Sequence, residues 1–463
     1  MKEAAFNRFF AHSMPDGKTL LTTDHGGWAL LDPRELEQLR GKKPGKPLAA
    51  KLEGAGIILS GRGRKKAGER LGKRFGFLFN GTSLHIINPT LRCNQSCVYC
   101  YADAKPAAAG CGQDMSRETA EKIVDFIFQS PAKSITIEFQ GGEPLLRFDL
   151  IRFIFGKAKE KNKAAGKRIL WNIVTNLSMM DGEKARFLER NRFGICTSLD
   201  GPEGLHMKNR PFLCNGSYGQ VVDWVKRLRA DFNIGHIGML PTITRQSLGH
   251  AKELVGLYAS LGAQDIRPVL LRRVGRAAKN WKKIGYSLEQ YLRFWKQVVE
   301  ECIERTRRGE FICETTAMLV LLKILGKRFP NYTCFSMPCG AALMQSAYAP
   351  NGDIFTCDEG KAMELFRLGN VWEDDYKAVY LSPNAMNIVQ LSSGFLLPCN
   401  DCPWHAYCGC CPVVAYASQG NPLAKLPLDF DCRVKKGQIG FVFEKLFSKD
   451  RDVLLQWAEK GKL

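Results

Sequence analysis

The chain has 463 residues, of which 45% are hydrophobic and 24% are charged. This composition supports a sizeable buried core and excludes both a disordered tail and a membrane-embedded protein. At roughly 150 residues per domain, the length suggests about three domains. No stretch approaches the ~20 apolar residues of a bilayer span. Residues 1–10 lack the basic and apolar regions of a secretory signal, so we expect a cytoplasmic protein.

A net charge of +21 and a total of 17 cysteines are the two unusual quantities. In a reducing cytoplasm the cysteines cannot form a disulfide framework, and their odd number argues against complete pairing. The positive charge suits nucleic acid, an acidic peptide or an anionic membrane. Nucleic acid is disfavoured because no RNP, KH or helix-turn-helix pattern is visible. Anionic iron–sulfur clusters would offset part of the charge, so metal binding is the first interpretation of the cysteines.

The first 74 residues predict a small separate unit. Two short strands, Thr19–Thr23 and Gly27–Leu31, flank a turn, and Asp32 caps a helix that begins with Pro33. This pattern resembles the winged-helix peptide-recognition unit that precedes many peptide-modifying enzymes, and a structural cap is the alternative. Seven basic residues within 61–74 indicate a solvated linker or, alternatively, a docking strip for an acidic leader peptide.

Strand-like and helix-like segments alternate through the middle of the chain. Such alternation predicts an α/β fold with a parallel sheet, either open or curled into a partial barrel, whose ligand sites lie at the carboxyl ends of the strands. The six strand candidates are Leu84–Ile87, Ser134–Phe139, Ile169–Val174, Gly194–Ser198, Ile237–Ile243 and Ile266–Leu271. The predicted divisions are the N-terminal unit with its basic linker (1–74), the barrel with a helical extension (80–330), a loop-rich cysteine module (331–440) and a C-terminal helix (441–463).

Two motifs follow the first two predicted strands. Cys93, Cys97 and Cys100 place three thiolates within eight residues, enough to hold one corner of a cubane cluster and leave one iron open. A zinc site would require a fourth protein ligand, and no obvious one is adjacent. The second motif is Gln140-Gly141-Gly142-Glu143-Pro144. Its glycines permit close approach of the backbone to a ligand, and Glu143 can accept a hydrogen bond from an ammonium group.

Together these motifs resemble the radical S-adenosylmethionine (SAM) superfamily, whose fold is a partial (β/α)6 barrel. The resemblance implies that the open iron of a [4Fe–4S] cluster binds SAM. One electron then cleaves SAM, and the resulting 5′-deoxyadenosyl radical abstracts a substrate hydrogen. By resemblance, Gln140, Ser198 and Arg210 hold the ribose and methionine carboxylate, and Tyr99 borders the adenine. The implied SAM-binding residues are Tyr99, Gln140, Gly141, Gly142, Glu143, Pro144, Asn176, Ser198, Asp200 and Arg210.

The cysteines after residue 331 resemble the SPASM domain of peptide-modifying radical enzymes, which holds two auxiliary four-iron clusters. The family places three residues between the last two cysteines of its central motif, whereas two separate Cys408 from Cys411 here. Cys410 therefore stays an alternative to Cys411, which precedes a proline as the family pattern suggests. Two zinc ribbons are the other alternative. The implied ligands are Cys334, Cys339, Cys357 and Cys411 for auxiliary cluster I, and Cys399, Cys402, Cys408 and Cys432 for auxiliary cluster II.

Asp358 directly follows Cys357. In the related sulfatase-maturing enzymes an aspartate at the matching position acts as a general base, which makes Asp358 the candidate catalytic residue. A role in a turn is the alternative.

The N-terminal unit occurs together with the motifs at 97–101, 137–144, 196–202, 356–360 and 366–371. With this combination the chain resembles, over most of its length, the B-type radical SAM maturase of the His-Xaa-Ser peptide system. This likeness implies SAM, three [4Fe–4S] clusters and a ribosomally made precursor with His-Xaa-Ser repeats, in which a side-chain cross-link is one product. It also implies a second radical SAM enzyme, a small accessory protein and a reducing electron donor. The alternatives are a formylglycine-forming sulfatase-maturing enzyme and a multi-zinc nucleic-acid-binding protein.

Overall fold

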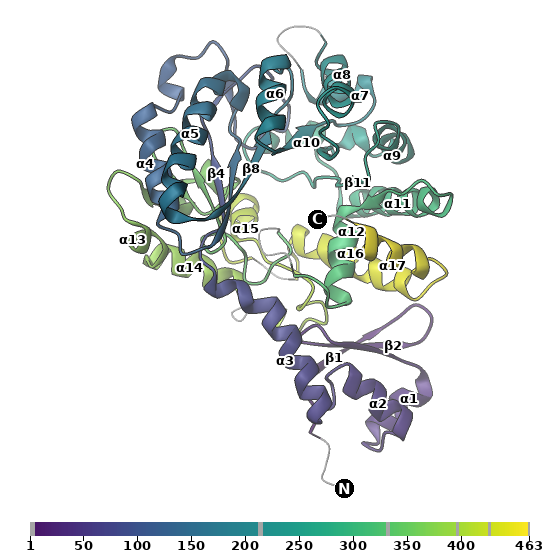
Figure 1. Ribbon diagram of the computed structural model, residues 1–463. Helices are drawn as coiled ribbons and strands as arrows, with labels where there is room; N and C mark the ends of the chain where they lie inside the picture. The colour runs from purple at the N-terminus through teal and green to yellow at the C-terminus, as the bar shows by residue number, and fades with distance from the viewer. Residues whose placement is uncertain (1–4, 212–215, 330–333, 395–397, 425–426, 462–463) are drawn as a thin grey trace.

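The computed structural model describes residues 5–211, 216–329, 334–394, 398–424 and 427–461. Its N-terminal unit lies at one end of the molecule, drawn in purple in Figure 1. The unit is an antiparallel sheet of β1 (Phe9–Ser13), β2 (Thr19–Thr23) and β3 (Trp28–Leu31), followed by helices α1 (Pro33–Arg40), α2 (Lys46–Gly54) and α3 (Gly61–Phe75). The predicted helix start is confirmed, since Asp32 and Glu35 form a capping box. Strand β1 was not predicted.

Residues 61–74, expected to be a solvated linker or a docking strip, form α3, and most of their basic side chains are exposed. Three of its basic side chains donate to backbone carbonyls elsewhere in the chain. Arg74 donates to Asp24 O, Arg70 to Gly26 O and Lys73 to Gly326 O. Arg74 is only 5% exposed. The first two bonds hold α3 to the β2–β3 turn of its own unit and the third joins it to Gly326, so part of its positive charge is structural.

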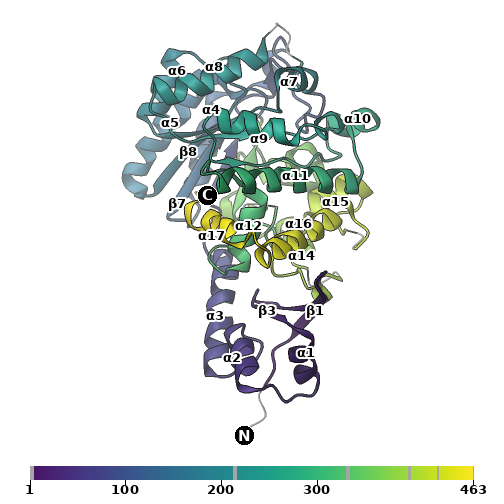
Figure 2. The ribbon, with the colours of Figure 1, turned by 90° about the vertical axis from the view of Figure 1, so that its right-hand side faces the viewer.

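The N-terminal unit packs against the segment between Cys399 and Cys408 (Figure 2). Thr22 Oγ1 donates to Pro403 O at 2.7 Å, and Tyr407 OH donates to Gly26 O at 3.1 Å. Trp28 Nε1 donates to Ile324 O at 3.0 Å. The strand end and turn of the N-terminal unit therefore contact a loop whose cysteines the sequence assigns to metal.

The centre of the fold is an eight-stranded sheet in the order β10-β9-β8-β7-β4-β13-β14-β15. Its first five strands are parallel and correspond to five of the six predicted strands. This arrangement bears out the α/β fold class. The strands are β4 (Leu84–Ile87), β7 (Ser134–Phe139), β8 (Arg168–Val174), β9 (Phe193–Ser198) and β10 (Ile237–Leu240). The helices between them are α4 (Arg117–Phe128), α5 (Phe148–Ala165), α6 (Gly182–Arg190), α7 (Glu203–Asn209) and α8 (Ser217–Ala230), and α9 (Ala251–Ser260) follows β10.

The prediction of a sixth strand over Ile266–Leu271 is wrong. Only β11 (Asp265–Ile266) forms, and it pairs with β12 (Cys313–Glu314) instead of the main sheet. Beyond it the segment runs beside the end of β10 through a single bridge between Thr242 and Val269. Pro268 interrupts regular pairing because proline has no backbone N–H to donate.

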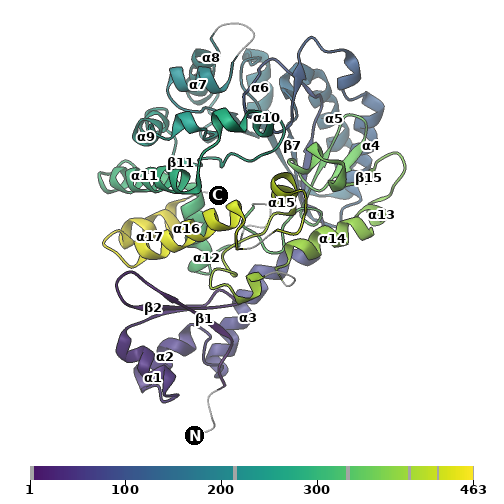
Figure 3. The same ribbon diagram turned by 180° about the vertical axis from the view of Figure 1, so that it is seen from behind.

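The cysteine-rich module continues the barrel sheet. Strand β13 (Gln345–Tyr348) pairs in parallel with β4, and β14 (Asp353–Phe355) and β15 (Arg367–Asn370) extend it in antiparallel fashion. Figure 3 shows β15 and the neighbouring α13–α15 on this side of the molecule. These helices are α13 (Tyr376–Tyr380), α14 (Pro383–Ser392) and α15 (Pro412–Gln419).

The remaining helices form a layer below the barrel in Figure 1. The single C-terminal helix expected over 441–463 is replaced by two helices, which separate near Asp450, where Lys445 and Arg307 both pair with this carboxylate. No helix in the described ranges is long and apolar enough to span a bilayer. The layer consists of α11 (Leu288–Arg307), α12 (Thr315–Ile324), α16 (Phe430–Leu446) and α17 (Arg451–Lys460), whereas α10 (Arg276–Ile284) is the exception and lies higher in that view.

We predict that Arg74→Met loosens the attachment of the N-terminal unit. It removes the donor from His405 O across the interface and from Asp24 O within the unit, and an unsatisfied buried carbonyl costs about 1–3 kcal/mol. Amide hydrogen exchange at Asp24–Gly27 and at residues 404–407 should become roughly tenfold faster. Arg64→Met is the matched control because Arg64 is exposed on the same helix. Equal exchange in both variants would show that Arg74 does not hold this interface.

Candidate metal and cofactor site

The three cysteines of the first motif lie together just beyond β4. Cys93 ends the short strand β5 (Arg92–Cys93), and Cys97 and Cys100 follow in the next turns. Burial, followed by the charges of Glu143, Cys97 and Cys100, raises the pKa of Cys93 to about 12. The loop is anchored where Val98 N donates to the carbonyl of Asn209 at 3.0 Å. Three thiols with this mutual influence form the donor set that one corner of a cubane cluster requires.

The glycine pair packs directly on the cysteine loop. A Cβ at Gly141 would lie 2.5 Å from Thr90 O, and one at Gly142 would lie 1.9 Å from Arg92 O. Gly141 also has a φ of +125°, a conformation that side chains rarely adopt. Gly142 N donates to Thr90 O at 2.9 Å. The close approach observed is thus between two backbone segments, which holds the loop bearing Cys93 against the end of β7.

Glu143 joins the ends of two strands. Its carboxylate, 1% exposed, accepts hydrogen bonds from Thr175 Oγ1 at 2.6 Å, Asn176 N at 2.8 Å and Leu145 N at 3.0 Å. Burial raises the pKa of Glu143 to about 7. A carboxylate offers about four acceptor positions, so one remains for a ligand donor. Asn176 Nδ2 donates to Asn94 Oδ1 at 2.9 Å, and Pro144 begins the short turn η3 (Pro144–Arg147).

Asp200, fully buried beyond the end of β9, binds two predicted site residues. It accepts a hydrogen bond from Tyr99 OH at 2.6 Å, and its Oδ2 lies 3.2 Å from Arg210 Nε. The Arg210 guanidinium lies over the Tyr99 ring at 5.3 Å, and its Nη1 is 3.7 Å from Cys97 Sγ. Arginine has five N–H donors, so this pairing leaves donors for a ligand carboxylate. Ser198 lies at the carboxyl end of β9.

Asp358 links the cysteine-rich module to the motif that begins at Gln140. Its carboxylate accepts hydrogen bonds from Tyr101 OH and from Lys361 Nζ, the latter at 2.6 Å. Tyr101 OH also lies 3.4 Å from Gln140 Oε1. Lys361 donates in addition to Asn88 Oδ1 at 2.9 Å, just beyond β4. Sequence reasoning did not identify Tyr101 or Lys361 as site residues, although the three-residue spacing of Asp358 and Lys361 is visible in the sequence.

The first set of four predicted auxiliary ligands gathers beside this link. Burial, followed by the charges of Glu359, Cys339 and Cys334, raises the pKa of Cys357 to about 12. Burial also raises the pKa of Cys411, with contributions from Cys334 and Cys339. Cys411 packs in the same apolar cluster as Cys357. The thiols of Cys334, Cys339, Cys357 and Cys411 are therefore neighbours.

The second set gathers on the other side of the module. Burial, followed by the charges of Cys408, Cys402 and Cys432, raises the pKa of Cys399 to about 12. Cys410 lies on this side, where the charges of Cys399 and Cys408 contribute to raising its pKa after burial. The adjacent Cys410 and Cys411 thus face different sets.

Spacing distinguishes these sets from a single-ion site. In the described ranges, no three His, Cys, Asp or Glu side chains lie close enough to hold one metal ion. A zinc ion draws its thiolates to about 2.3 Å, whereas a four-iron cluster interposes its own iron and sulfide atoms.

Of the other cysteines, Cys302 and Cys313 are buried. Cys196 lies in β9, and Cys214 and the Cys111 side chain lie outside the described residues.

A cavity of about 530 Å³ lies where these parts meet. Its walls come from the residues after Cys100, the loop before α10, the turn after Asp358 and the helix after Cys411. The lining residues are Tyr101, Ala102, Asp103, Arg273, Val274, Gly275, Ala362, Met363, Tyr416, Ala417, Ser418 and Gly420.

Residues 87–255, which carry both motifs, match the radical SAM superfamily. This segment is a radical SAM domain. A multi-zinc nucleic-acid-binding protein does not account for this domain. A cysteine-type anaerobic sulfatase-maturating enzyme of Clostridium perfringens (strain ATCC 13124) is 23% identical over 376 residues, which cover 77% of this chain and 95% of that one.

Two solved structures share the fold of the radical SAM enzyme. The sulfatase-maturating enzyme anSMEcpe with bound AdoMet has a TM-score of 0.68 and 20% identity, covering 81% of this chain and 98% of the other. Streptococcus suis SuiB bound to its precursor peptide SuiA has a TM-score of 0.55 and 17% identity, covering 92% of this chain and 98% of the other. The second likeness extends over a larger share of this chain.

We predict that Gly142→Ala strongly destabilises the enzyme, because its Cβ would lie 1.9 Å from a backbone oxygen and displace the cysteine loop. The expected loss is more than about 3 kcal/mol, seen as a clear fall in the midpoint of thermal unfolding. Gly156→Ala in α5 is the matched control, since nothing lies within 4 Å of the added carbon. It should leave the midpoint equal or slightly higher, because alanine favours helix by about 1 kcal/mol. Equal midpoints for the two variants would refute the packing role.

Proposed function

We propose that the enzyme modifies a ribosomally made precursor peptide or protein of the His-Xaa-Ser type, with a side-chain cross-link as one candidate product. The observation that carries this proposal is the cavity, which lies between the three-cysteine loop, Asp358 and the first set of auxiliary thiols. A cavity of about 530 Å³ accommodates a few side chains of an extended peptide. Its two tyrosines, Tyr101 and Tyr416, provide apolar surface with polar ends.

The radical SAM site is assigned to the residues that surround the first motif. Cys93, Cys97 and Cys100 fit a [4Fe–4S] cluster because three neighbouring thiols leave one iron free. When bound, the cluster and SAM supply a 5′-deoxyadenosyl radical that takes a hydrogen atom from the substrate. Around them Arg210 offers N–H donors to a carboxylate and Glu143 offers an acceptor to an ammonium group. The full proposed SAM site is Tyr99, Gln140, Gly141, Gly142, Glu143, Pro144, Asn176, Ser198, Asp200 and Arg210.

Two auxiliary [4Fe–4S] clusters are assigned to the two sets of four thiols. Cys411 packs in the same cluster as Cys357, whereas Cys410 packs with Cys399 of the second set. This packing supports Cys411 over Cys410 as the ligand of the first cluster. Asp358 follows Cys357 and bonds to Tyr101, which lines the cavity. We assign it as the acceptor of the substrate proton, held by Tyr101 and Lys361.

The N-terminal unit is proposed to bind the leader segment of the precursor. Its three strands followed by three helices support the predicted resemblance to a winged-helix peptide-recognition unit. SuiB, whose likeness includes most of this chain, was solved with a precursor peptide. The wider proposal includes a second radical SAM enzyme, a small accessory protein, a reducing electron donor and a cytoplasmic location.

Sulfatase maturation is the second candidate function. The likeness to the Clostridium sulfatase-maturating enzyme and the aspartate after Cys357 favour it. The two candidates differ in the peptide that should stimulate SAM cleavage.

We predict that a His-Xaa-Ser precursor stimulates release of 5′-deoxyadenosine by the reconstituted enzyme, whereas a Cys- or Ser-containing sulfatase peptide does not. Chromatography of the nucleoside product measures the rate. Cys97→Ala is the control, because it should abolish cleavage yet retain the auxiliary clusters, with iron falling from about twelve to about eight per chain. Stimulation by the sulfatase peptide alone would favour the second candidate, and cleavage by Cys97→Ala would refute the site assignment.

Asp358→Ala is predicted to separate SAM cleavage from product formation. Without its carboxylate the substrate proton loses its proposed acceptor, which is bonded to Tyr101 of the cavity wall, so modified peptide should fall by roughly 100-fold. Release of 5′-deoxyadenosine should continue, since Asp358 does not contact the three-cysteine loop in any described interaction. Mass spectrometry of the peptide measures the product. Asp353→Ala, which removes a carboxylate from β14 in the same module, is the comparison. Product at the normal rate in Asp358→Ala would show that it is not the base.

A further inference from the structure

Three largely buried cations, Arg272, Lys323 and Lys435, lie between the two sets of auxiliary thiols. Arg272 is 14% exposed and its Nη1 lies 3.6 Å from Cys334 Sγ, in the first set. The same nitrogen pairs with the carboxylate of Glu359, two residues after Cys357. Arg272 comes from the loop after β11, so the barrel itself supplies a positive charge to this set.

Lys435, on α16, faces both sets. It is 3% exposed and donates to the carbonyl of Gly409 at 2.9 Å, next to Cys408. The charges of both Cys408 and Cys334 act on it. Its ion pair with Asp431 measures 2.6 Å, and Arg272 Nη2 lies 3.9 Å from the other oxygen of that carboxylate. Asp431 thus connects two cations that belong to different elements.

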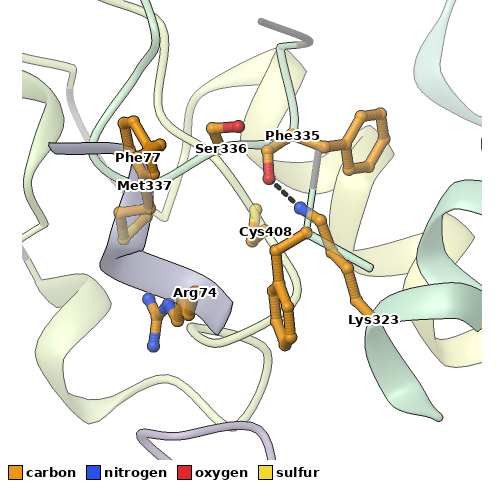
Figure 4. A pocket seen from close by; sticks show the side chains of 8 residues that line it. Arg74, Phe77, Lys323, Phe335, Ser336, Met337 and Cys408 are labelled. Carbon is orange, nitrogen blue, oxygen red and sulfur yellow. Dashed lines mark hydrogen bonds between the residues drawn. The ribbon is translucent and has the colours of Figure 1, made fainter. Parts of the chain in front are cut away.

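Lys323, on α12, is 2% exposed and lies beside the second set. Figure 4 shows its Nζ pointing to the carbonyl of Phe335, with Cys408 in the same small cavity. Two ammonium groups lie over the Phe335 ring, that of Lys323 at 5.8 Å and that of Lys435 at 5.5 Å from its centroid. Burial lowers the pKa of Lys323 to about 7 and Cys408 opposes this, so an anion beside Cys408 favours the charged form.

The charges in this interior do not balance within the described residues. Asp431 pairs with Arg272 and Lys435, and Glu359 pairs with Arg272, but no described carboxylate pairs with Lys323. Lys323 donates to the carbonyls of Phe335 and Tyr407, but a buried ammonium without a counter-ion is costly. Four thiolates around a four-iron cluster carry about two negative charges in total. Two such clusters would place negative charge on both sides of these cations.

We propose that Arg272, Lys323 and Lys435 form a cationic bridge that raises the reduction potentials of both auxiliary clusters. This inference rests on the proposed assignment of those clusters. A cluster gains one negative charge when one electron reduces it, and a nearby fixed cation stabilises the reduced state more than the oxidised state. The three cations are expected to act on different clusters. Arg272 acts on cluster I, Lys323 acts on cluster II, and Lys435 acts on both.

The test is a dithionite titration followed by electron paramagnetic resonance. Dithionite supplies the electron, and a Cys93/Cys97/Cys100→Ala background removes the signal of the SAM cluster. Arg272→Met should lower the potential of one auxiliary cluster and Lys323→Met that of the other, while Lys435→Met should lower both. The expected fall in the ratio of reduced to oxidised cluster is roughly tenfold at fixed ambient potential, equal to about 59 mV.

Arg433→Met is the matched control, because it removes one positive charge from the same helix as Lys435. Arg433 is half exposed and pairs with Glu289 at 3.5 Å, so neither potential should move. Unchanged potentials in all three bridge variants that retain about eight irons would overturn the proposal. If Lys435→Met loses iron because Asp431 is left unpaired, Lys323→Met decides, since it strands no described carboxylate. About four irons per wild-type chain after reconstitution would instead refute the auxiliary-cluster assignment.

Discussion

The parallel pairing of β13 with β4 is the contact on which the composite site depends. Tyr348 lies beside Ile87 in this register, so the cysteine-rich module begins at the same edge where the three-cysteine loop leaves the barrel. The module is therefore a continuation of the barrel sheet. This continuity brings Asp358 within reach of Tyr101 and places Lys361 on Asn88. Residues separated by more than 250 positions thus form one cavity wall.

Charge is distributed between the interior and the surface in a way that composition alone conceals. The net charge of +21 suggests a surface for acidic partners. Several of the cations are instead buried, including Arg74, Arg210, Lys323 and Lys435. Arg210 is neutralised by Asp200, whereas the cations near the auxiliary thiols exceed the carboxylates around them in the described structure. The interior of the module is consequently suited to anionic groups.

The sequence predicted those structural features that depend on residues close together in the chain. The strands β4, β7, β8 and β9, the cap at Asp32 and the gathering of the motif cysteines depend on short-range spacing. The role of the glycine pair was only half foreseen, because nothing in the sequence showed that Arg92 O would occupy the space beside Gly142. The helix over 61–74 was not predicted for a related reason, because three of its basic residues donate to acceptors far away in the chain. The partners of Arg272, Lys323 and Lys435 are equally remote, so no motif marks these residues.

Several of the hydrogen bonds that dock the N-terminal unit run from side-chain donors to backbone carbonyls. Thr22, Trp28 and Arg74 donate to the main-chain oxygens of Pro403, Ile324 and His405, and Tyr407 donates to Gly26 O from the opposite side. A carbonyl is present whatever side chain its residue carries. Substitutions on the accepting segments are thus tolerated as long as the backbone path is kept, whereas the donors cannot change. During evolutionary divergence such an interface can persist while half of its sequence drifts beyond recognition, and the donor positions are where a distant relative would still be identifiable.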